Sequence, residues 1–215
     1  MFLDNRTKMN LDGGVQVVDM TSGEPEHQGA LRIWNLFQGD KVSMRVLEMD
    51  SDGHAELRNE DQEEVLFQFD DDTAFHLPAG NTLAIDGEMT LISVRTPGVR
   101  GTGKETLCVT LDDRPLQRTG DRWYSELIQG EVTQFVGIIP PGRAPDHHHL
   151  YEEVICILEG EGRMWAGDSS TPIAKGSCIY LPRGQRHCVE NSGAGDMRLL
   201  GVFYPAGSPA VRYAD

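Results

Sequence analysis

The chain has 215 residues, of which 39% are hydrophobic and 25% charged, and its formal net charge is −15 at pH 7. This length provides for one large domain or two small ones, and the composition is that of an ordinary globular protein. The strong negative charge argues against nucleic acid and against an anionic membrane as partners. The chain has no apolar run long enough to span a membrane, no apolar signal stretch at its start and few cysteines, so we expect a cytoplasmic protein with reduced thiols.

The first half of the chain contains stretches that are typical of β-strands. Apolar side chains at strand periodicity predict strands over residues 31–37, 42–49 and 89–94. A segment between them, 57–69, can be laid over 146–158 so that a shared Glu-Glu-Val sequence coincides. The two halves are therefore expected to share one architecture, unless this match is a chance similarity between two β-hairpins.

A segment rich in turn-forming residues separates the two halves. Several glycines between residues 97 and 129, among them Gly101 and Gly120, interrupt regular structure there. The run at 123–128 is predicted to be the strand that opens the second half. We therefore expect two domains, at 1–100 and 101–215.

The second half carries a group of potential metal ligands. On a β-strand the side chains of His147, His149 and Glu153 would share one face, because alternate residues point the same way. His148 would point away from them. Neutral imidazole and carboxylate donors together suit Fe, Mn, Ni, Zn or Cu(II). The apolar run 154–158 that follows is expected to be a strand that is covered on both faces.

A fourth donor follows the next predicted strand. Residues 176–181 form a short apolar run that ends at Pro182, whose ring removes a backbone donor. Gly184 permits a tight turn, after which His187 begins another strand. The turn is expected to direct His187 back toward the first three donors.

These two blocks resemble the two signature motifs of the cupin superfamily. The second block matches the family pattern at Gly176, Pro182, Gly184, His187 and Asn191. The first block matches at His147, His149, Glu153 and Gly160, whereas its leading glycine, Gly142, lies one residue closer to the first histidine than usual. The resemblance implies an all-β fold, the double-stranded β-helix or RmlC-like jelly roll, with His147, His149, Glu153 and His187 as metal ligands. The alternative is that the histidines belong to a solvated polar loop.

The first half then resembles a second cupin barrel that has lost its metal site. Arg58, Glu60 and Leu83 stand at the positions of the three histidines, and Glu64 stands at that of Glu153. A single carboxylate beside an arginine does not make a transition-metal site. We therefore expect two cupin barrels in tandem, of which only the second binds metal.

The expected cofactor is one divalent transition metal ion, with Fe²⁺ or Mn²⁺ favoured and Zn²⁺, Ni²⁺ or Cu²⁺ also open. Three imidazoles and one carboxylate leave two neighbouring positions on an octahedral ion for substrate or dioxygen. Glu153 is the candidate catalytic base. The expected substrate contacts are Ile155, Ile157, Tyr180, Arg163 and Gln185.

Cupin-like proteins perform many reactions, so the fold does not name the substrate. We favour an enzyme that acts on a small organic molecule, with a dioxygenase-type oxidoreductase first and a redox-neutral isomerase, decarboxylase or lyase as the alternative. A non-catalytic protein that binds metal or ligand is a further alternative. The outer face of the run 154–158 needs cover, either from the other barrel or from a second copy in a homodimer.

Overall fold

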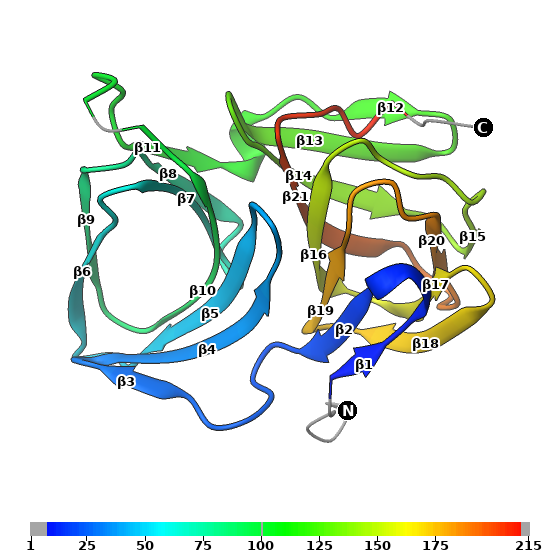
Figure 1. Cartoon of the computed structure of the whole chain (residues 1–215), viewed down its shortest axis with the longest axis horizontal. Coiled ribbons are helices and arrows are strands. Elements are labelled where there is room, and N and C mark those ends of the chain that lie inside the picture. Colours follow the sequence, from blue (N-terminus) through cyan, green and yellow to red (C-terminus); the bar gives the residue numbers. More distant parts are fainter. Residues whose placement is uncertain (1–7, 100, 212–215) are drawn as a thin grey trace. The chain divides into compact units, whose positions relative to one another are not determined.

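The computed structural model describes residues 8–99 and 101–211 (Figure 1). The chain forms two compact units, one made of Met1–Ser22 with Arg114–Asp215 and the other of Gly23–Asp113. We call them the terminal unit and the inserted unit. These bounds differ from the expected division at residue 100, because the start of the chain belongs with the second half and residues 101–113 stay with the first. None of the helices in the described ranges has the length and apolarity that crossing a membrane requires.

The terminal unit consists of two antiparallel sheets. The larger sheet has eight strands in the order β1-β2-β19-β16-β21-β14-β13-β12, and the smaller has four in the order β15-β20-β17-β18. The larger sheet contains β1 (Met9–Asn10), β2 (Gln16–Asp19), β12 (Gln117–Thr119), β13 (Arg122–Gln129), β14 (Thr133–Ile139), β16 (Glu152–Glu159), β19 (Ser177–Leu181) and β21 (Met197–Tyr204). The smaller sheet contains β15 (Gly142–Arg143), β17 (Glu161–Ala166), β18 (Ser169–Ala174) and β20 (His187–Asn191).

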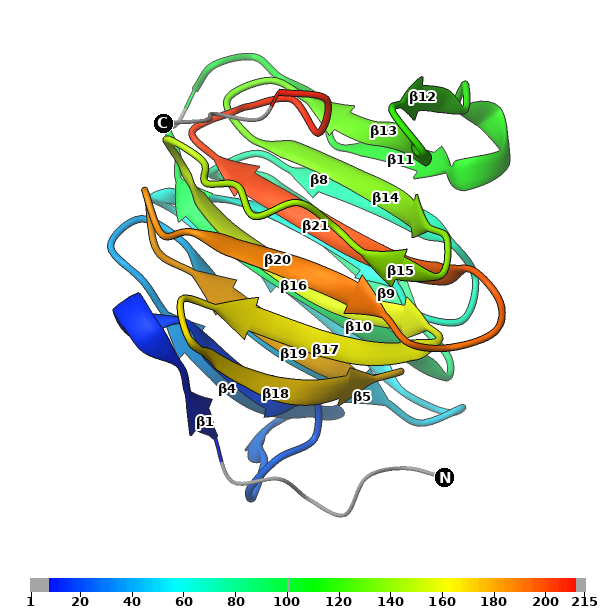
Figure 2. The ribbon, with the colours of Figure 1, turned by 90° about the vertical axis from the view of Figure 1, so that its right-hand side faces the viewer.

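The two sheets of the terminal unit pack face to face around one apolar core, as Figure 2 shows for β17 and β20 in front of β16 and β19. Strand alternation decides which residues enter it. Ile155 and Ile157 of the larger sheet meet Met164 and Val189 of the smaller one in this core. Glu153 lies on the same inward face of β16 as Ile155, so the sheet carries a carboxylate to the edge of an apolar interior.

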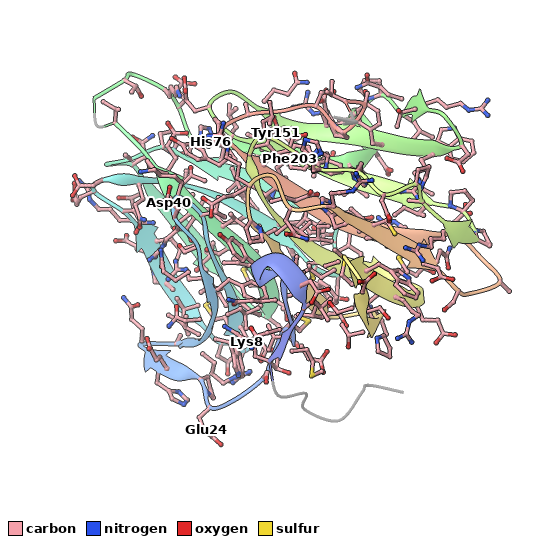
Figure 3. All side chains as sticks on the ribbon, turned by 45° about the vertical axis from the view of Figure 1, so that its right-hand side comes forward. Lys8, Glu24, Asp40, His76, Tyr151 and Phe203 are labelled. Carbon is pink, nitrogen blue, oxygen red and sulfur yellow. The ribbon has the colours of Figure 1, made fainter. Side chains whose placement is uncertain are left out.

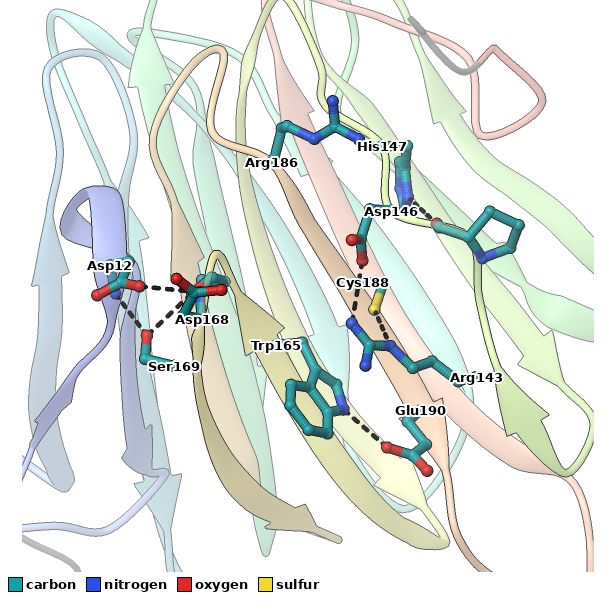
Figure 4. A network of polar contacts seen from close by, with 12 residues as sticks. Asp12, Arg143, Asp146, His147, Trp165, Asp168, Ser169, Arg186, Cys188 and Glu190 are labelled. Carbon is teal, nitrogen blue, oxygen red and sulfur yellow. Dashed lines mark hydrogen bonds and ion pairs between the residues drawn. The ribbon is translucent and has the colours of Figure 1, made fainter.

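The start of the chain completes the larger sheet. In Figure 1 the blue strand β2 lies beside the orange strand β19, and Val17 pairs with Ile179. The short 3-10 helix η1 (Asp12–Gly14) precedes β2, and Val15 and Val17 are buried in the core. The Asp12 amide donates to Ser169 Oγ at 2.8 Å, and the Asp12 carboxylate accepts from the Asp168 amide at 3.0 Å (Figure 4). This segment is therefore a structural part of the unit that follows much later in sequence.

The inserted unit also consists of two antiparallel sheets, with seven strands in the order β11-β8-β7-β10-β5-β4-β3 and two in the pair β6-β9. The larger sheet contains β3 (Glu26–Gln28), β4 (Leu31–Gln38), β5 (Ser43–Met49), β7 (Gln62–Gln68), β8 (Thr73–Leu77), β10 (Met89–Pro97) and β11 (Leu107–Thr110). The pair consists of β6 (His54–Arg58) and β9 (Thr82–Asp86), and the 3-10 helix η2 (Leu111–Asp113) ends the unit. The strands predicted over 31–37, 42–49 and 89–94 are confirmed as β4, β5 and β10.

The core of the inserted unit is apolar and separate from that of the terminal unit. Leu47 of β5, Leu66 of β7 and Leu91 of β10 are buried together in it. Glu64 lies on the same face of β7 as Leu66, just as Glu153 lies on the same face of β16 as Ile155. Apart from the 3-10 helices η1 and η2, all the described elements are β-strands, so the all-β prediction is confirmed.

Candidate metal centre

Three histidine rings converge inside the terminal unit. One ring nitrogen from each of His147, His149 and His187 lies within 4.8 Å of the corresponding nitrogens of the other two. The ring centroids of His147 and His187 are 4.6 Å apart, and those of His147 and His149 are 4.8 Å apart. His149 and His187 are buried, whereas His147 is partly exposed. His148 is not a member of this cluster.

A backbone bridge, and not one continuous strand, positions the cluster. The prediction that His147, His149 and Glu153 share a strand is wrong, because β16 begins only at Glu152. His147 instead forms an isolated bridge with His187, in which the His147 amide donates to the His187 carbonyl at 3.0 Å and the reverse bond measures 2.9 Å. This pair of bonds brings the two motifs together.

Backbone carbonyls orient two of the three rings. His147 Nδ1 lies 3.1 Å from the Pro145 carbonyl oxygen, and His187 Nδ1 lies 2.8 Å from the Gln185 carbonyl oxygen. A carbonyl oxygen can only accept, so each Nδ1 carries the proton and each Nε2 keeps its lone pair. Histidine ligands of metals are commonly held in this manner.

A surface network holds the loop that carries His147. Arg143 Nε donates to Cys188 Sγ at 3.2 Å, and the same guanidinium forms an ion pair with Asp146 at 3.3 Å (Figure 4). The guanidinium also lies over the Trp165 ring, at 4.1 Å from its centroid. Because Cys188 follows His187, these contacts tie both histidine-bearing segments to each other from outside.

The carboxylate of Glu153 completes the cluster. Glu153 Oε2 lies 3.4 Å from His149 Nε2 and 3.8 Å from His187 Nε2. Among the described residues, neither Glu153 Oε2 nor His149 Nδ1 has a hydrogen-bond partner, although both atoms are buried. Polar atoms buried in this way are costly and indicate an absent partner.

Burial makes Glu153, His149 and His187 prefer their neutral forms. Burial raises the pKa of Glu153 to about 8. Burial and then the neighbouring imidazoles lower the pKa of His149 to about 3, and burial first also lowers the pKa of His187 to about 4. Although the distances would permit ion pairs, the Glu153 carboxyl group and the imidazoles of His149 and His187 are therefore neutral near pH 7 unless a cation joins them.

The donors fit a divalent transition metal ion. Nitrogen and oxygen ligands at about 2.0–2.2 Å from one ion lie no more than roughly 4.3 Å apart. Adjacent ligands lie nearer to about 3 Å apart, so side-chain shifts of about an ångström would bring these three nitrogens, which lie within 4.8 Å of one another, into range. Imidazoles with inward lone pairs and a carboxylate without a partner form a donor set for Fe, Mn, Zn, Ni or Cu.

Comparison with protein families matches residues 135–203 to the cupin domain family. These residues are a cupin domain. Their match covers both histidine-bearing segments and Glu153, and ends at Phe203 of β21.

Solved structures extend the cupin likeness over most of the chain. A putative glyoxylate-induced protein from Pseudomonas aeruginosa has a TM-score of 0.78 at 14% identity, covering 94% of this chain and 93% of that chain. Oxalate decarboxylase from Bacillus subtilis, in a study of its Mn(II) centres, has a TM-score of 0.70 at 12% identity, covering 89% and 78%. At such identities the likeness shows the fold alone, and it confirms the predicted jelly roll.

Curated relatives match the cupin domain more locally. The oxalate-binding protein from Thermotoga maritima is 34% identical over 67 residues, which are 30% of this chain and 55% of that protein. The matches span about half the length of the curated relatives, from 42% to 55%.

A cavity of about 90 Å³ adjoins the four candidate ligands of the cupin domain. Its wall is otherwise mainly apolar and aromatic, and includes Tyr124, Phe135, Ile155, Val189, Leu199 and Phe203. Gly201 leaves room for one of these rings, because a Cβ there would lie 2.3 Å from the Phe135 ring. A cavity this small and apolar suits a small organic molecule.

Two aromatic residues that the sequence analysis missed support His149. The Tyr151 ring stacks on the His149 ring at 4.8 Å, and Phe203 lies 4.4 Å from Tyr151 (Figure 3). Phe203 lies on the inward face of β21, where it pairs with Glu153, and Tyr151 directly precedes β16. The sequence could have indicated Phe203 only through the alternation of side chains along β21. That alternation does not reveal which of the two faces points inward.

Of the five predicted substrate contacts, Ile155 lines the cavity, whereas Ile157 lies in the core farther along β16. Tyr180 pairs with Val154 and so lies on the opposite face from Glu153. The Tyr180 hydroxyl there donates to Glu152 Oε1 at 2.5 Å.

The two predicted polar contacts also lie elsewhere. Arg163 Nη2 donates to Ser170 Oγ at 2.9 Å, and Gln185 Nε2 donates to the Arg186 carbonyl at 2.9 Å. Gln185 also covers Gly13, where a Cβ would lie 1.5 Å from Gln185 Oε1. Ile157, Tyr180, Arg163 and Gln185 are thus not among the described residues that line this cavity.

Proposed function

We propose that this chain is a metal-dependent cupin enzyme that acts on a small organic molecule, with His147, His149, Glu153 and His187 as ligands of one Fe²⁺ or Mn²⁺ ion. The observation that carries this proposal is the buried carboxyl group of Glu153. Its Oε2 atom lies beside the imidazoles but has no hydrogen-bond donor among the described residues. The adjoining apolar cavity supports a substrate beside the metal rather than a purely structural ion.

The chain's own residues orient the imidazoles, exclude water from the cavity and supply a proton acceptor. The carbonyls of Pro145 and Gln185 hold the imidazoles in the tautomer that turns Nε2 inward. The aromatic wall around Phe135 and Phe203 excludes water, which strengthens electrostatic contacts within the cavity. A bound divalent ion would add Lewis acidity and, as iron or manganese, redox chemistry. Glu153 is the proposed base, because its carboxyl group lines the cavity.

The first candidate reaction is a dioxygenase-type oxidation, which the donor set accommodates. The second is a redox-neutral cleavage such as a decarboxylation. Its support is the likeness to an oxalate-binding protein and to oxalate decarboxylase. Both candidates use the same ligands and the same cavity.

Oxygen consumption separates the two candidates. Metal-free protein would be loaded with Fe²⁺ or Mn²⁺ under nitrogen and offered diketones, phenols and small carboxylic acids, with and without dioxygen. An oxidase or dioxygenase consumes dioxygen stoichiometrically with product, whereas a lyase releases carbon dioxide or another fragment under nitrogen as well. His187→Ala is the matched inactive control. Tight ligand binding without any turnover in either atmosphere would favour the non-catalytic alternative.

We also propose that the inserted unit is a second cupin-type barrel without a metal site. Its two sheets, its separate core and the inward placement of Glu64 support this duplication. A cytoplasmic location and a homodimer remain predictions. Val154, Cys156 and Leu158, the outward residues of β16 that need cover, are all buried.

A further inference from the structure

His149 lacks the hydrogen bond that orients the other two imidazoles of the cluster. The Nδ1 atoms of His147 and His187 each face a backbone carbonyl oxygen, at 3.1 and 2.8 Å. The Nδ1 atom of His149 is buried but has no hydrogen-bond partner among residues 8–99 and 101–211. An imidazole without such a bond can turn about its ring torsion, because that torsion has broad minima. Other contacts must therefore fix the plane of this ring if it is to bind a metal.

The ring of Tyr151 provides such a contact. Its centroid lies 4.8 Å from that of His149, and the two ring planes are inclined by only 12°. Both side chains are buried. Phe203 supports the pair, with its ring centroid 4.4 Å from that of Tyr151 and 5.4 Å from that of His149. Stacking between two buried rings is favourable, and close packing leaves the imidazole little room to turn.

The segment after β21 holds Tyr151 in turn. The Tyr151 hydroxyl donates to the Ser208 carbonyl at 3.4 Å. Gly207 packs against the ring, since a Cβ there would lie 2.2 Å from Tyr151 Cε1. The hydroxyl of Thr133 donates to the Gly207 carbonyl at 2.9 Å and accepts from the Gly207 amide at 3.2 Å. These contacts fix the segment against the ring of Tyr151.

The same segment also forms part of the cavity wall. Pro209 lines the cavity together with His149. A molecule in the cavity can therefore contact the segment directly at Pro209, while the segment reaches His149 through Tyr151. The position of residues 206–209 and the plane of the imidazole are thus linked by one series of contacts.

We propose that Tyr151 is a positioning residue for the metal centre: it fixes the plane of the His149 imidazole and couples that plane to the segment 206–209 at the cavity wall. This proposal rests on the proposed function, because it requires a metal ion at the histidines. Tyr151 is not among the described residues that line the cavity, so it acts through His149 and not on the substrate. Outer contacts that hold a metal-binding histidine in place usually contribute about 10- to 100-fold to metal affinity.

Tyr151→Leu in the full chain tests the stacking. Mn²⁺ would be titrated into metal-free protein, with the EPR signal of free Mn²⁺ giving the dissociation constant and the spectrum of the bound ion reporting its ligand geometry. We expect the dissociation constant to rise by about 10- to 100-fold and the bound spectrum to change. Tyr151→Phe keeps the ring and should restore most of the affinity. Tyr180→Leu is the matched control and should change neither readout, since Tyr180 is also buried in the terminal unit but is not among the described cavity residues.

Thr133→Val tests the coupling to the segment. Valine keeps the shape of threonine but removes both hydrogen bonds to Gly207, so we expect a smaller rise in the dissociation constant, of about 3- to 10-fold. In a Tyr151→Leu background the same change should have no further effect, because the connection to His149 is already broken. Thr171→Val, at a similarly buried threonine of β18, is the control.

Any of four results would overturn the proposal. If Tyr151→Leu keeps the wild-type affinity and spectrum, His149 does not need the stacked ring, while the proposed function stands. If Tyr180→Leu weakens Mn²⁺ binding as much as Tyr151→Leu does, the effect is a general loss of stability. An unchanged affinity in Thr133→Val refutes the coupling, and this result decides alone should Tyr151→Leu not fold. If the wild-type chain binds neither Mn²⁺ nor Fe²⁺ at the histidines, the proposed function fails and this proposal fails with it.

Discussion

Two glutamates at matching places in the two units, Glu64 and Glu153, have opposite charge environments. Glu64 is fully buried and accepts from Arg45 at 2.7 Å and from Arg95 at 3.3 Å, with further hydrogen bonds from Ser93 and Asn59. Burial alone would raise the pKa of Glu64, but the charges of Arg45 and Arg95 and the hydrogen bonds outweigh it and lower that pKa. Among the described residues no guanidinium forms an ion pair with Glu153, and burial raises the pKa of Glu153 to about 8.

The comparison teaches what a buried carboxylate requires. A carboxylate inside an apolar barrel is stable only with a cation or with donors that satisfy its oxygens. The inserted unit provides guanidinium groups from its own strands β5 and β10. In the described part of the terminal unit, Glu153 instead meets the imidazoles of His149 and His187, whose lone pairs cannot satisfy the carboxylate but can join it around a metal ion.

The largest expected effect is the loss of metal from the terminal unit. His187→Ala should lower metal content from about one ion per chain to less than about a tenth, because one of the few ligands disappears. His148→Ala should keep the ion, since His148 is outside the cluster. Mass spectrometry of the purified variants measures this. Two tightly held ions per wild-type chain would mean that the inserted unit also binds metal. That result would contradict the difference between the two units.

The same substitution should have effects of very different size in the two units. Glu64→Gln leaves buried Arg45 without its carboxylate and should lower the free energy of unfolding by about 3–5 kcal/mol at pH 7. Glu153→Gln in metal-free protein should change it by less than about 1 kcal/mol, because the carboxyl group is already protonated and similar in shape. Urea denaturation of both variants provides the values. Equal losses would show that Glu153 is ionised without metal.

A smaller effect tests the assignment of the first residues to the terminal unit. Val15→Ala removes two buried methyl groups from the core and should cost this unit about 1.5–2.5 kcal/mol. In a Trp34→Phe background the remaining tryptophans, Trp123 and Trp165, both belong to the terminal unit and report its unfolding by fluorescence. Val65→Ala, in the inserted unit, is the control. It should not change the unfolding transition of the terminal unit that these tryptophans report.

The smallest effect is the proton that metal binding should release. At pH 7 Glu153 is mostly protonated because its pKa is about 8, whereas His149 and His187 are already neutral with pKa values of about 3 and 4. Binding should therefore release about one proton per ion, and affinity should rise with pH up to about 8 and then level off. Calorimetry in two buffers of different ionisation enthalpy counts the proton. If the Glu153→Gln variant also released a proton on binding metal, that proton would come from another group.

The sequence predicted the parts of the molecule that local spacing determines. The two histidine-bearing blocks led to the cupin fold, and the structure brings His147, His149 and His187 together with Glu153. Spacing did not show that a backbone bridge, and not a strand, positions them. It also could not show the face of Tyr180, because that depends on the register between β16 and β19.

Contacts between strands that are distant in the chain could not be predicted from the sequence. The alignment placed Arg58 near Glu64, but Arg58 pairs with the partly exposed Glu60 at 2.7 Å. The arginines that do reach Glu64, Arg45 and Arg95, become its neighbours only when β5, β7 and β10 pair, and no local pattern reports such pairing. The partner of β2 was missed for the same reason.

The pairing of β2 with β19 has a consequence for synthesis on the ribosome. Asp19 and Ser177, which meet in this pair, are 158 positions apart. At translation rates of about 5–20 residues per second, β2 waits roughly 8–30 s for its partner, while the inserted unit, continuous in sequence, can fold earlier. During this interval Val15 and Val17 are apolar side chains of an unpaired edge, the kind of segment to which chaperones bind and through which nascent chains aggregate. Of the four proposed metal ligands, His187 lies beyond β19 in the chain, so the complete ligand set is also synthesised only at the end of this interval.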